Sequence, residues 1–336
     1  MRFLSERWGK LARRSETIRT GIDLGTASVK LVRGVGFPGL RRITHLGIED
    51  WDPDESGDVV ERAAGALERL LSRLRLQRRQ LGRIAVAADD DEGDFRETDM
   101  VSLSDADLRR SAPFEAKKHL ALDEMEAPII DFQVLERFTE AGTAKPPGMR
   151  VLFAAIPKSA REFPMWVLAK AGLEPEVVDL ESMAGLNAMM ASMRAEDSAA
   201  DRVALLDMGR RGVVLRITGR AGGILKRPLG AAPPYGGSAE SVAEYGDDLI
   251  GGIRETLTFY RGRHRKEVDR FYLSGGGALA SGLAEHLRSG LDCELSPLDP
   301  FRGLEVENAE GNAAIAESTR FVTACGLCRW WDPDDV

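Results

Sequence analysis

Three short stretches of this sequence place acidic residues or glycines at sharp turns, a combination that suits the binding of a phosphate group. In the first stretch, Asp23 precedes Gly25, and two hydroxyl residues, Thr26 and Ser28, follow closely. Successive backbone amides in such a turn can cradle a phosphate, and an aspartate beside it can hold the waters of a Mg²⁺ ion. An ordinary hairpin, in which Asp23 only caps the turn, is the alternative.

The second and third stretches lie in the C-terminal half of the chain. Asp207 and Gly209 follow an apolar run in the same order as Asp23 and Gly25. Three glycines, residues 275–277, then separate an apolar run from a sequence with helical periodicity. Glycines at the start of a helix let a nucleotide approach bare backbone and the helix N-terminus. Three such stretches in this order predict a nucleotide site more strongly than any one of them alone.

Apolar runs of strand length flank all three turns, so we expect β-strands to carry the candidate residues. Alternating and β-branched residues predict strands over 22–24 and 29–32, around the first turn. Apolar residues at helical spacing predict a helix over about 58–76. A continuous apolar run over 151–156 is typical of a buried strand. This mixture predicts an α/β fold in which sheets are flanked by helices.

The composition suits a globular protein of two domains. The chain has 336 residues, of which 43% are hydrophobic and 30% charged. Its net charge of −8 argues against general nucleic-acid binding, which needs a basic face. We find neither an apolar run of membrane-spanning length nor a signal peptide, and therefore expect a cytoplasmic location. Cys325 and Cys328 lie late in a predicted helix without further metal ligands nearby, so we expect them to pack in a core.

With these turns, the chain resembles the actin-like ATPase superfamily and, within it, the PilM proteins of type IV pilus assembly. The resemblance extends from about residue 17 to 329 and is most specific over residues 21–32, 114–135, 151–187 and 273–304. It implies an actin-like, ribonuclease H-like α/β fold of two lobes around a nucleotide cleft. It also implies that ATP contacts the turns at Asp23, Gly25, Thr26, Ser28, Asp207, Gly209, Gly275, Gly276 and Gly277.

The resemblance assigns further roles to four acidic residues. Asp23 and Asp207 match the positions that would hold Mg²⁺ through water. Glu181, with Asp179 as the second choice, matches the carboxylate that orients the attacking water in members that hydrolyse ATP. A cap on the following helix is the alternative role for Glu181. Separately, we interpret residues 89–94 as a solvated acidic loop without a bound cation.

We expect the chain to be organised as an N-terminal arm and two lobes. Residues 1–20 form a basic amphipathic segment, which either touches a membrane or is a plain arm. The N-terminal lobe spans 21–195 with an inserted subdomain over about 85–150, and the C-terminal lobe spans 196–332, shortened at about 230–248. In PilM-like proteins, the groove beside this subdomain takes the cytosolic N-terminal tail of PilN, an inner-membrane protein. The resemblance therefore implies a peripheral location at the cytoplasmic face of the inner membrane, among other pilus or secretion components.

Two departures from the family pattern bear on function. Arg210 and Arg211 follow the second turn, where small or hydroxyl residues are usual, and residues 230–248 lack the subdomain that lines the adenosine site. The leading hypothesis is a PilM-like scaffold that docks a membrane partner's tail, which ATP could gate by closing the lobes. An active but at most slow ATPase, or a small-molecule kinase, is one alternative. A nucleotide-free docking protein that resembles the cytoplasmic domain of GspL is the other.

Overall fold

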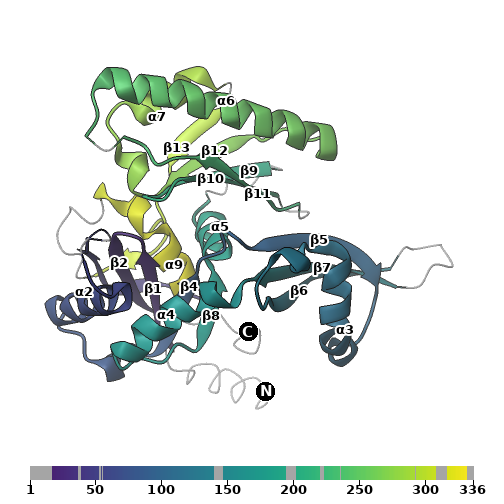
Figure 1. Ribbon diagram of the computed structural model, residues 1–336, viewed down its shortest axis with the longest axis horizontal. Coiled ribbons are helices and arrows are strands. Elements are labelled where there is room, and N and C mark those ends of the chain that lie inside the picture. Colours follow the sequence, from purple (N-terminus) through teal and green to yellow (C-terminus); the bar gives the residue numbers. More distant parts are fainter. Residues whose placement is uncertain are drawn as a thin grey trace, which may run out of the picture.

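The computed structural model folds into two lobes and a smaller projecting sheet (Figure 1). Each lobe is a β-sheet with helices on its faces, which confirms the predicted α/β organisation. The structure describes residues 17–36, 39–52, 54, 56–139, 147–193, 202–219, 223–234, 236–291, 293–307 and 316–330. No helix in these parts of the chain is both long and apolar enough to cross a membrane.

The sheet of the first lobe has six strands in the order β14-β3-β2-β1-β4-β8. Its strands are β1 (Thr17–Gly25), β2 (Ser28–Gly36), β3 (Arg42–Asp50), β4 (Arg83–Ala88), β8 (Val177–Leu180) and β14 (Glu305–Val306). β1 and β2 form the hairpin around the first candidate turn, and β1 also pairs in parallel with β4. This hairpin lies in the interior of the sheet, where neighbouring strands on both sides fix its position.

Helices cover both faces of this sheet. They are α2 (Val59–Arg73), α4 (Lys158–Lys170), α5 (Glu181–Ser192) and α9 (Val322–Cys328). α2 and α4 pack on one face, where Leu67 belongs to the same apolar cluster as Ile22 of β1. Asp58 caps α2 by accepting a hydrogen bond from the amide of Val60. α5 and α9 lie on the opposite face, against β4 and β1.

The projecting unit is a three-stranded sheet in the order β5-β7-β6, inserted between elements of the first lobe. Its elements are β5 (Asp94–Val101), α3 (Asp105–His119), β6 (Ile129–Phe138) and β7 (Gly148–Ile156). Ser104 caps the start of α3, and Leu108 of this helix belongs to the same apolar cluster as Phe153 of the sheet. The unit begins near residue 94 and not near 85, because residues 83–88 form β4 of the main sheet.

The second lobe contains a five-stranded sheet in the order β11-β10-β9-β12-β13. Its elements are β9 (Arg202–Met208), β10 (Val213–Gly219), β11 (Leu225–Gly230), α6 (Ala239–His264), β12 (Arg270–Ser274), α7 (Leu283–Gly290) and β13 (Glu294–Pro297). α6 and α7 cover one face of this sheet. On the other face, Leu186 and Met189 of α5 pack against Leu205 of β9. α5 therefore stands between the sheets of the two lobes (Figure 1).

The chain returns from the second lobe to the first after β13. β14 pairs in parallel with β3, and α9 packs on β1 and β2. α9 crosses α5 so closely that a Cβ atom at Gly326 would lie 1.8 Å from the carbonyl oxygen of Ala184. Cys325 and Cys328 of α9 are completely buried, which confirms their predicted place in a core. Burial raises the pKa of Cys328 to about 12, so this thiol stays protonated.

Two predicted boundaries differ from the structure. Residues 17–20, assigned to the basic arm, form the start of β1, while residues 1–16 and their membrane contact lie outside the described residues. The helix predicted directly after the third turn begins only at Leu283, because a short 3₁₀ turn precedes it. Among the described residues, the 3₁₀ turns are η1 (Arg78–Gln80), η2 (Leu122–Glu124), η4 (Gly276–Leu279) and η5 (Ser318–Phe321).

Candidate functional site

A cleft of about 720 Å³ opens between the two lobes, and all three candidate turns line it. Cavities of this size suit a small organic ligand. Nine of the predicted residues lie on its walls: Asp23, Gly25, Thr26, Ser28, Glu181, Asp207, Gly209, Gly275 and Gly276. Two predicted residues do not belong to the lining. Gly277, the last glycine of the third turn, is buried, and Asp179 lies in β8.

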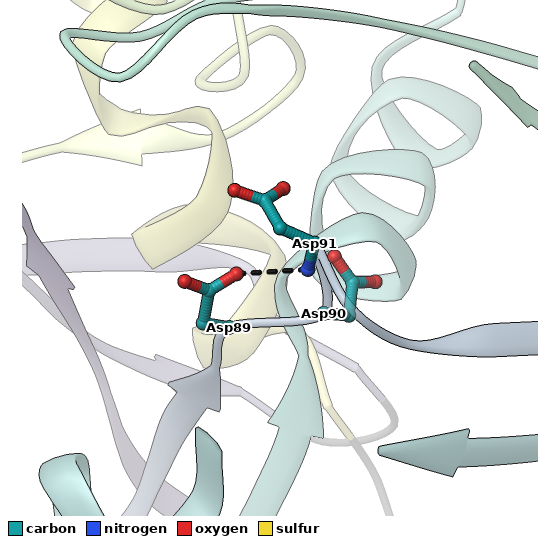
Figure 2. A group of neighbouring side chains, drawn as sticks. All are labelled: Asp89, Asp90 and Asp91. Atoms are coloured by element: carbon teal, nitrogen blue, oxygen red, sulfur yellow. Dashed lines mark hydrogen bonds between the residues drawn. The ribbon is translucent and has the colours of Figure 1, made fainter. Parts of the chain in front are cut away.

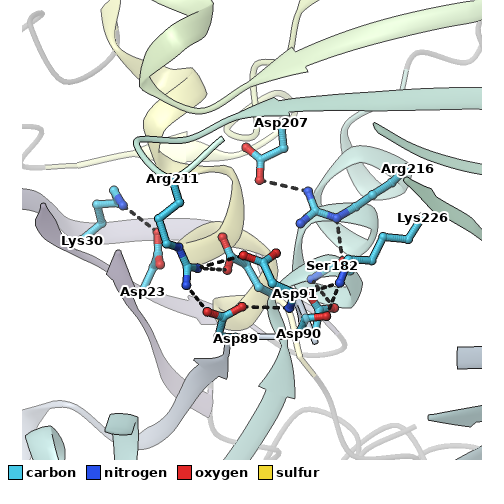
Figure 3. A network of polar contacts seen from close by, with 11 residues as sticks. Asp23, Lys30, Asp89, Asp90, Asp91, Ser182, Asp207, Arg211, Arg216 and Lys226 are labelled. Carbon is cyan, nitrogen blue, oxygen red and sulfur yellow. Dashed lines mark hydrogen bonds and ion pairs between the residues drawn. The ribbon is translucent and has the colours of Figure 1, made fainter. Parts of the chain in front are cut away.

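The first turn connects β1 to β2 and contains an ion pair that the sequence analysis missed. Asp23 and Lys30 lie directly opposite each other in the hairpin, and 2.9 Å separates Lys30 Nζ from Asp23 Oδ2 (Figure 3). Only 14% of the Lys30 side chain and 10% of the Asp23 side chain are exposed. A Cβ atom at Gly25 would lie 2.5 Å from Lys30 Nζ, so this ammonium group lies over the turn.

The second turn, between β9 and β10, carries a more deeply buried ion pair. Arg216 Nη1 lies 2.9 Å from Asp207 Oδ2, and Ser274 Oγ donates a hydrogen bond of 2.8 Å to Asp207 Oδ1. Arg216 Nε also donates to Ser182 Oγ at 2.7 Å. The Arg216 side chain is 3% exposed. In the sequence, Arg216 stands out as the one charged residue within the apolar run of residues 213–217.

The third turn follows β12 and closes the cleft beside the second turn. Gly275 has a φ angle of +82°, which lies in the left-handed region that favours glycine. A Cβ atom there would lie 2.4 Å from the carbonyl oxygen of Met208. The Gly275 amide donates a hydrogen bond of 2.9 Å to the carbonyl of Thr319. Glycine at this position therefore lets the third turn contact the end of β9.

Arg211, on the second turn, bridges the two lobes. Its guanidinium contacts Asp89, which follows β4 of the first lobe (Figure 3). The same group lies 3.7 Å from the carboxylates of both Asp91 and Glu181. Its neighbour Arg210 reaches Asp54 at 3.3 Å, but both of these side chains are largely exposed. Arg211 thus occupies the mouth of the cleft with partners from the first lobe.

Asp89, Asp90 and Asp91 form a compact acidic group at the edge of the cleft (Figure 2). The prediction of a solvated loop is wrong for Asp90, which is fully buried. Asp90 Oδ2 accepts a hydrogen bond of 3.2 Å from the Ser182 amide, and Lys226 Nζ lies 3.5 Å from Asp90 Oδ1. These partners compensate the burial of the carboxylate. With Arg211 on the other two aspartates, two basic side chains of the second lobe offset part of the charge of the group.

Glu181 has an electrostatic environment that favours its neutral form. Burial, and then the negative charges of Asp23 and Asp207, raise the pKa of Glu181 to about 8. Burial also raises the pKa of Asp179 to about 6, against the opposing effect of a hydrogen bond from the Leu180 amide. At neutral pH, Glu181 therefore carries a proton and is a poor acceptor for a proton from water.

The residues present do not fit a Mg²⁺ ion at the two aspartates. Asp23 already pairs with Lys30, and both oxygens of Asp207 already accept hydrogen bonds from Arg216 and Ser274. A divalent cation held by these carboxylates through water would stand beside two fixed positive charges. The cleft can hold an anion such as a phosphate chain, but its carboxylates are neutralised by the protein itself.

Two lobes, each a sheet with flanking helices, around a cleft lined by two Asp–Gly hairpins and a glycine-rich turn, define a protein of the actin-like ATPase fold. Residues 21–240 and 234–329 match the model of the type IV pilus assembly protein PilM. The chain belongs to the PilM family.

Comparison with solved structures agrees with this fold. A structure of the PilM–PilN type IV pilus biogenesis complex superposes with a TM-score of 0.70 at 20% identity, over 92% of this chain and 97% of that one. Weaker likenesses include the ethanolamine utilization protein EutJ from Carboxydothermus hydrogenoformans, with a TM-score of 0.45, 14% identity, and coverage of 94% and 90%. The cytoplasmic domain of EpsL from the type II secretion system of Vibrio cholerae also gives 0.45, at 10% identity, with coverage of 94% and 97%.

Proposed function

We propose that this chain is a cytoplasmic scaffold of type IV pilus assembly that binds the cytosolic tail of a PilN-like inner-membrane protein. The match to the PilM family from residue 21 to residue 329 carries the proposal. The PilM–PilN structure, which matches 92% of this chain, supports a partner of that kind. Membrane association would then come from the partner.

A binding role suits the cleft better than turnover does. A hydrolytic site needs a base that accepts a proton from the attacking water, and Glu181 is protonated near neutral pH. This feature favours a scaffold over an ATPase or a kinase.

The edge strand β6 is the surface that we assign to the partner's tail. Within the described parts of the chain, β6 pairs with β7 alone, so its outer backbone groups can accept an extended peptide. The opposite edge strand, β5, already contacts the second lobe, because Glu97 accepts hydrogen bonds from the amides of Gly223 and Ile224. Leu135, at a bulge in β6, adds an apolar side chain that is 39% exposed.

Fluorescence anisotropy with a labelled peptide from the N-terminal cytosolic segment of the PilN-like protein tests this role. We expect saturable binding that a scrambled peptide does not reproduce. Leu135→Asp should weaken binding by about tenfold or more, whereas Val101→Asp, on the exposed part of β5, should stay within about twofold of wild type. Absence of binding would overturn the partner assignment, and equal effects of the two variants would remove β6 as its location.

Nucleotide binding in the cleft would reach the partner surface through the contacts between the lobes. Arg211 joins the second lobe to Asp89, and Glu97 joins the inserted sheet to Gly223 and Ile224. A ligand that changes the position of one lobe relative to the other would therefore move the inserted sheet. We expect saturating ATP to change the affinity for the peptide by about threefold or more. Unchanged affinity with ATP bound would exclude gating.

A nucleotide-free docking protein is the second candidate function. Arg211 favours it, because its guanidinium already fills the mouth of the cleft with Asp89, Asp91 and Glu181 as partners. Calorimetric titration of the folded protein with millimolar ATP separates the two candidates. Saturable heat supports the gated scaffold, and absence of heat together with intact peptide binding supports the nucleotide-free form.

A further inference from the structure

Arg216 occupies the position in this cleft where a divalent cation would neutralise the second aspartate. Its guanidinium contacts Asp207 Oδ2 at 2.9 Å and Ser182 Oγ at 2.7 Å. Ser182 belongs to α5, which lies between the two sheets, so the group is held from both lobes. An arginine side chain keeps its charge at every pH at which proteins are folded. Arg216 is therefore a permanent cation built into the wall of the cleft.

Lys30 supplies a second fixed cation at the first turn. Its ammonium group pairs with Asp23 at 2.9 Å and lies over Gly25, where a phosphate cradled by the turn would sit. Lys30 and Arg216 thus place one positive charge on each of the two hairpins. Both line the cleft, and both are largely shielded from water, which strengthens their interaction with an anion.

The acidic residues on the cleft wall are nearly matched in number by basic residues of the protein itself. Five bases line it, namely Lys30, Arg210, Arg211, Arg216 and Arg320. The acids are Asp23, Asp50, Asp91, Glu181, Asp207 and Glu317. The wall therefore carries nearly as many bases as acids, and Lys30 and Arg216 each contact one of the two hairpin aspartates. A phosphate chain bound at this wall would lie beside hairpin carboxylates that are already paired with bases. It therefore needs no divalent cation to screen these carboxylates.

We propose that the cleft binds the phosphate chain of a nucleoside triphosphate without Mg²⁺, with Arg216 and Lys30 as the cations in its place. This inference rests on the nucleotide part of the proposed function and specifies how that site works. It also accounts for a PilM-family cleft that has both hairpin aspartates, each already paired with a base of the protein.

Calorimetric titration of the full chain with ATP, once in EDTA and once in excess Mg²⁺, tests the proposal. We expect dissociation constants that agree within about threefold. Inorganic tripolyphosphate should displace ATP in EDTA, because Lys30 and Arg216 would bind the phosphate chain and not the nucleoside. Binding that requires Mg²⁺, or a failure of tripolyphosphate to compete, would overturn the inference while nucleotide binding stands. Absence of ATP binding in both buffers would remove the nucleotide proposal as well.

A variant at Arg216 gives a second and sharper test. Arg216→Met removes the charge but keeps much of the side-chain volume, and leaves Asp207 able to bind a cation. We expect it to lose about tenfold or more of its ATP affinity in EDTA and to regain it in Mg²⁺. Arg216→Lys keeps the charge and should remain independent of Mg²⁺. A metal-independent Arg216→Met variant would contradict the role of this arginine; if that variant does not fold, the wild-type titrations decide.

Discussion

Glu181→Gln should stabilise the folded protein at alkaline pH and leave its stability almost unchanged at acidic pH. Burial, together with Asp23 and Asp207, raises the pKa of Glu181 from 4.5 to about 8. Between these values, the folded state holds a proton that the unfolded chain has released. The stabilising contribution of the Glu181 proton is therefore full below pH 4.5 and is lost as the pH rises toward 8. Glutamine does not ionise, so the variant escapes this loss.

The size of the effect follows from the pKa and the exposure of the side chain. One pKa unit corresponds to about 1.4 kcal/mol, so the whole rise amounts to roughly 5 kcal/mol at most. Glu181 keeps 28% of its side chain exposed, and an Arg211 nitrogen lies 3.7 Å from its carboxylate. Water and this cation reduce the cost of the charge. We expect the variant to gain about 2 kcal/mol at pH 9 and less than about 0.5 kcal/mol at pH 5.

Urea denaturation at pH 5, 7 and 9 measures these free energies of unfolding, provided that the denaturant slopes of variant and wild type agree. Glu255→Gln on α6 is the matched control, because its exposed carboxylate pairs with Arg227 at 3.0 Å. That change should stay within about 0.5 kcal/mol at every pH. If the difference between Glu181→Gln and wild type were the same at the three pH values, Glu181 would keep one charge state throughout, and the reasoning would be refuted.

Two further predictions concern the packing of α9. Gly326→Ala should destabilise the protein by about 3 kcal/mol or more, because the new methyl group would meet the carbonyl of Ala184. Gly251→Ala lies on an open part of α6 and should stabilise the protein by up to about 1 kcal/mol. Urea denaturation measures both, and similar effects would contradict the close crossing. Both α9 thiols should resist a thiol reagent in the folded protein, since burial raises their pKa, while the half-buried Cys293 reacts. Reaction of all three thiols with the reagent at the same rate would contradict the burial of Cys325 and Cys328.

The part of the site that lies within hairpins could be predicted from the sequence. An apolar run, an aspartate, a glycine and a second apolar run place Asp23 and Asp207 at strand ends, and local periodicity is enough to show it. The pairing of Lys30 with Asp23 could also have been predicted from the sequence. Once Gly25 lies opposite Ser28, the antiparallel register puts these two side chains directly opposite each other.

The rest of the site depends on contacts between distant parts of the chain. Val214 lies opposite Asp207, so Arg216 is its diagonal neighbour on the same face, but its second partner, Ser182, comes from α5. The burial of Asp90 was missed for the same reason. Three consecutive aspartates suggest a solvated loop. The Ser182 amide and Lys226, both from remote segments, compensate the burial of the Asp90 carboxylate.

The return of α9 to the first lobe has a consequence for the order in which the chain folds during its synthesis. β1 and β2 precede every other described strand in the chain, yet residues 322–328 complete the apolar core beneath them. Part of one face of the first lobe must therefore stay uncovered until residues 322–328 have been translated. During that interval its apolar residues are exposed, and chaperones bind surfaces of this kind, which aggregate when left alone. The second lobe, whose main core is built from residues 204–295, needs no such delay.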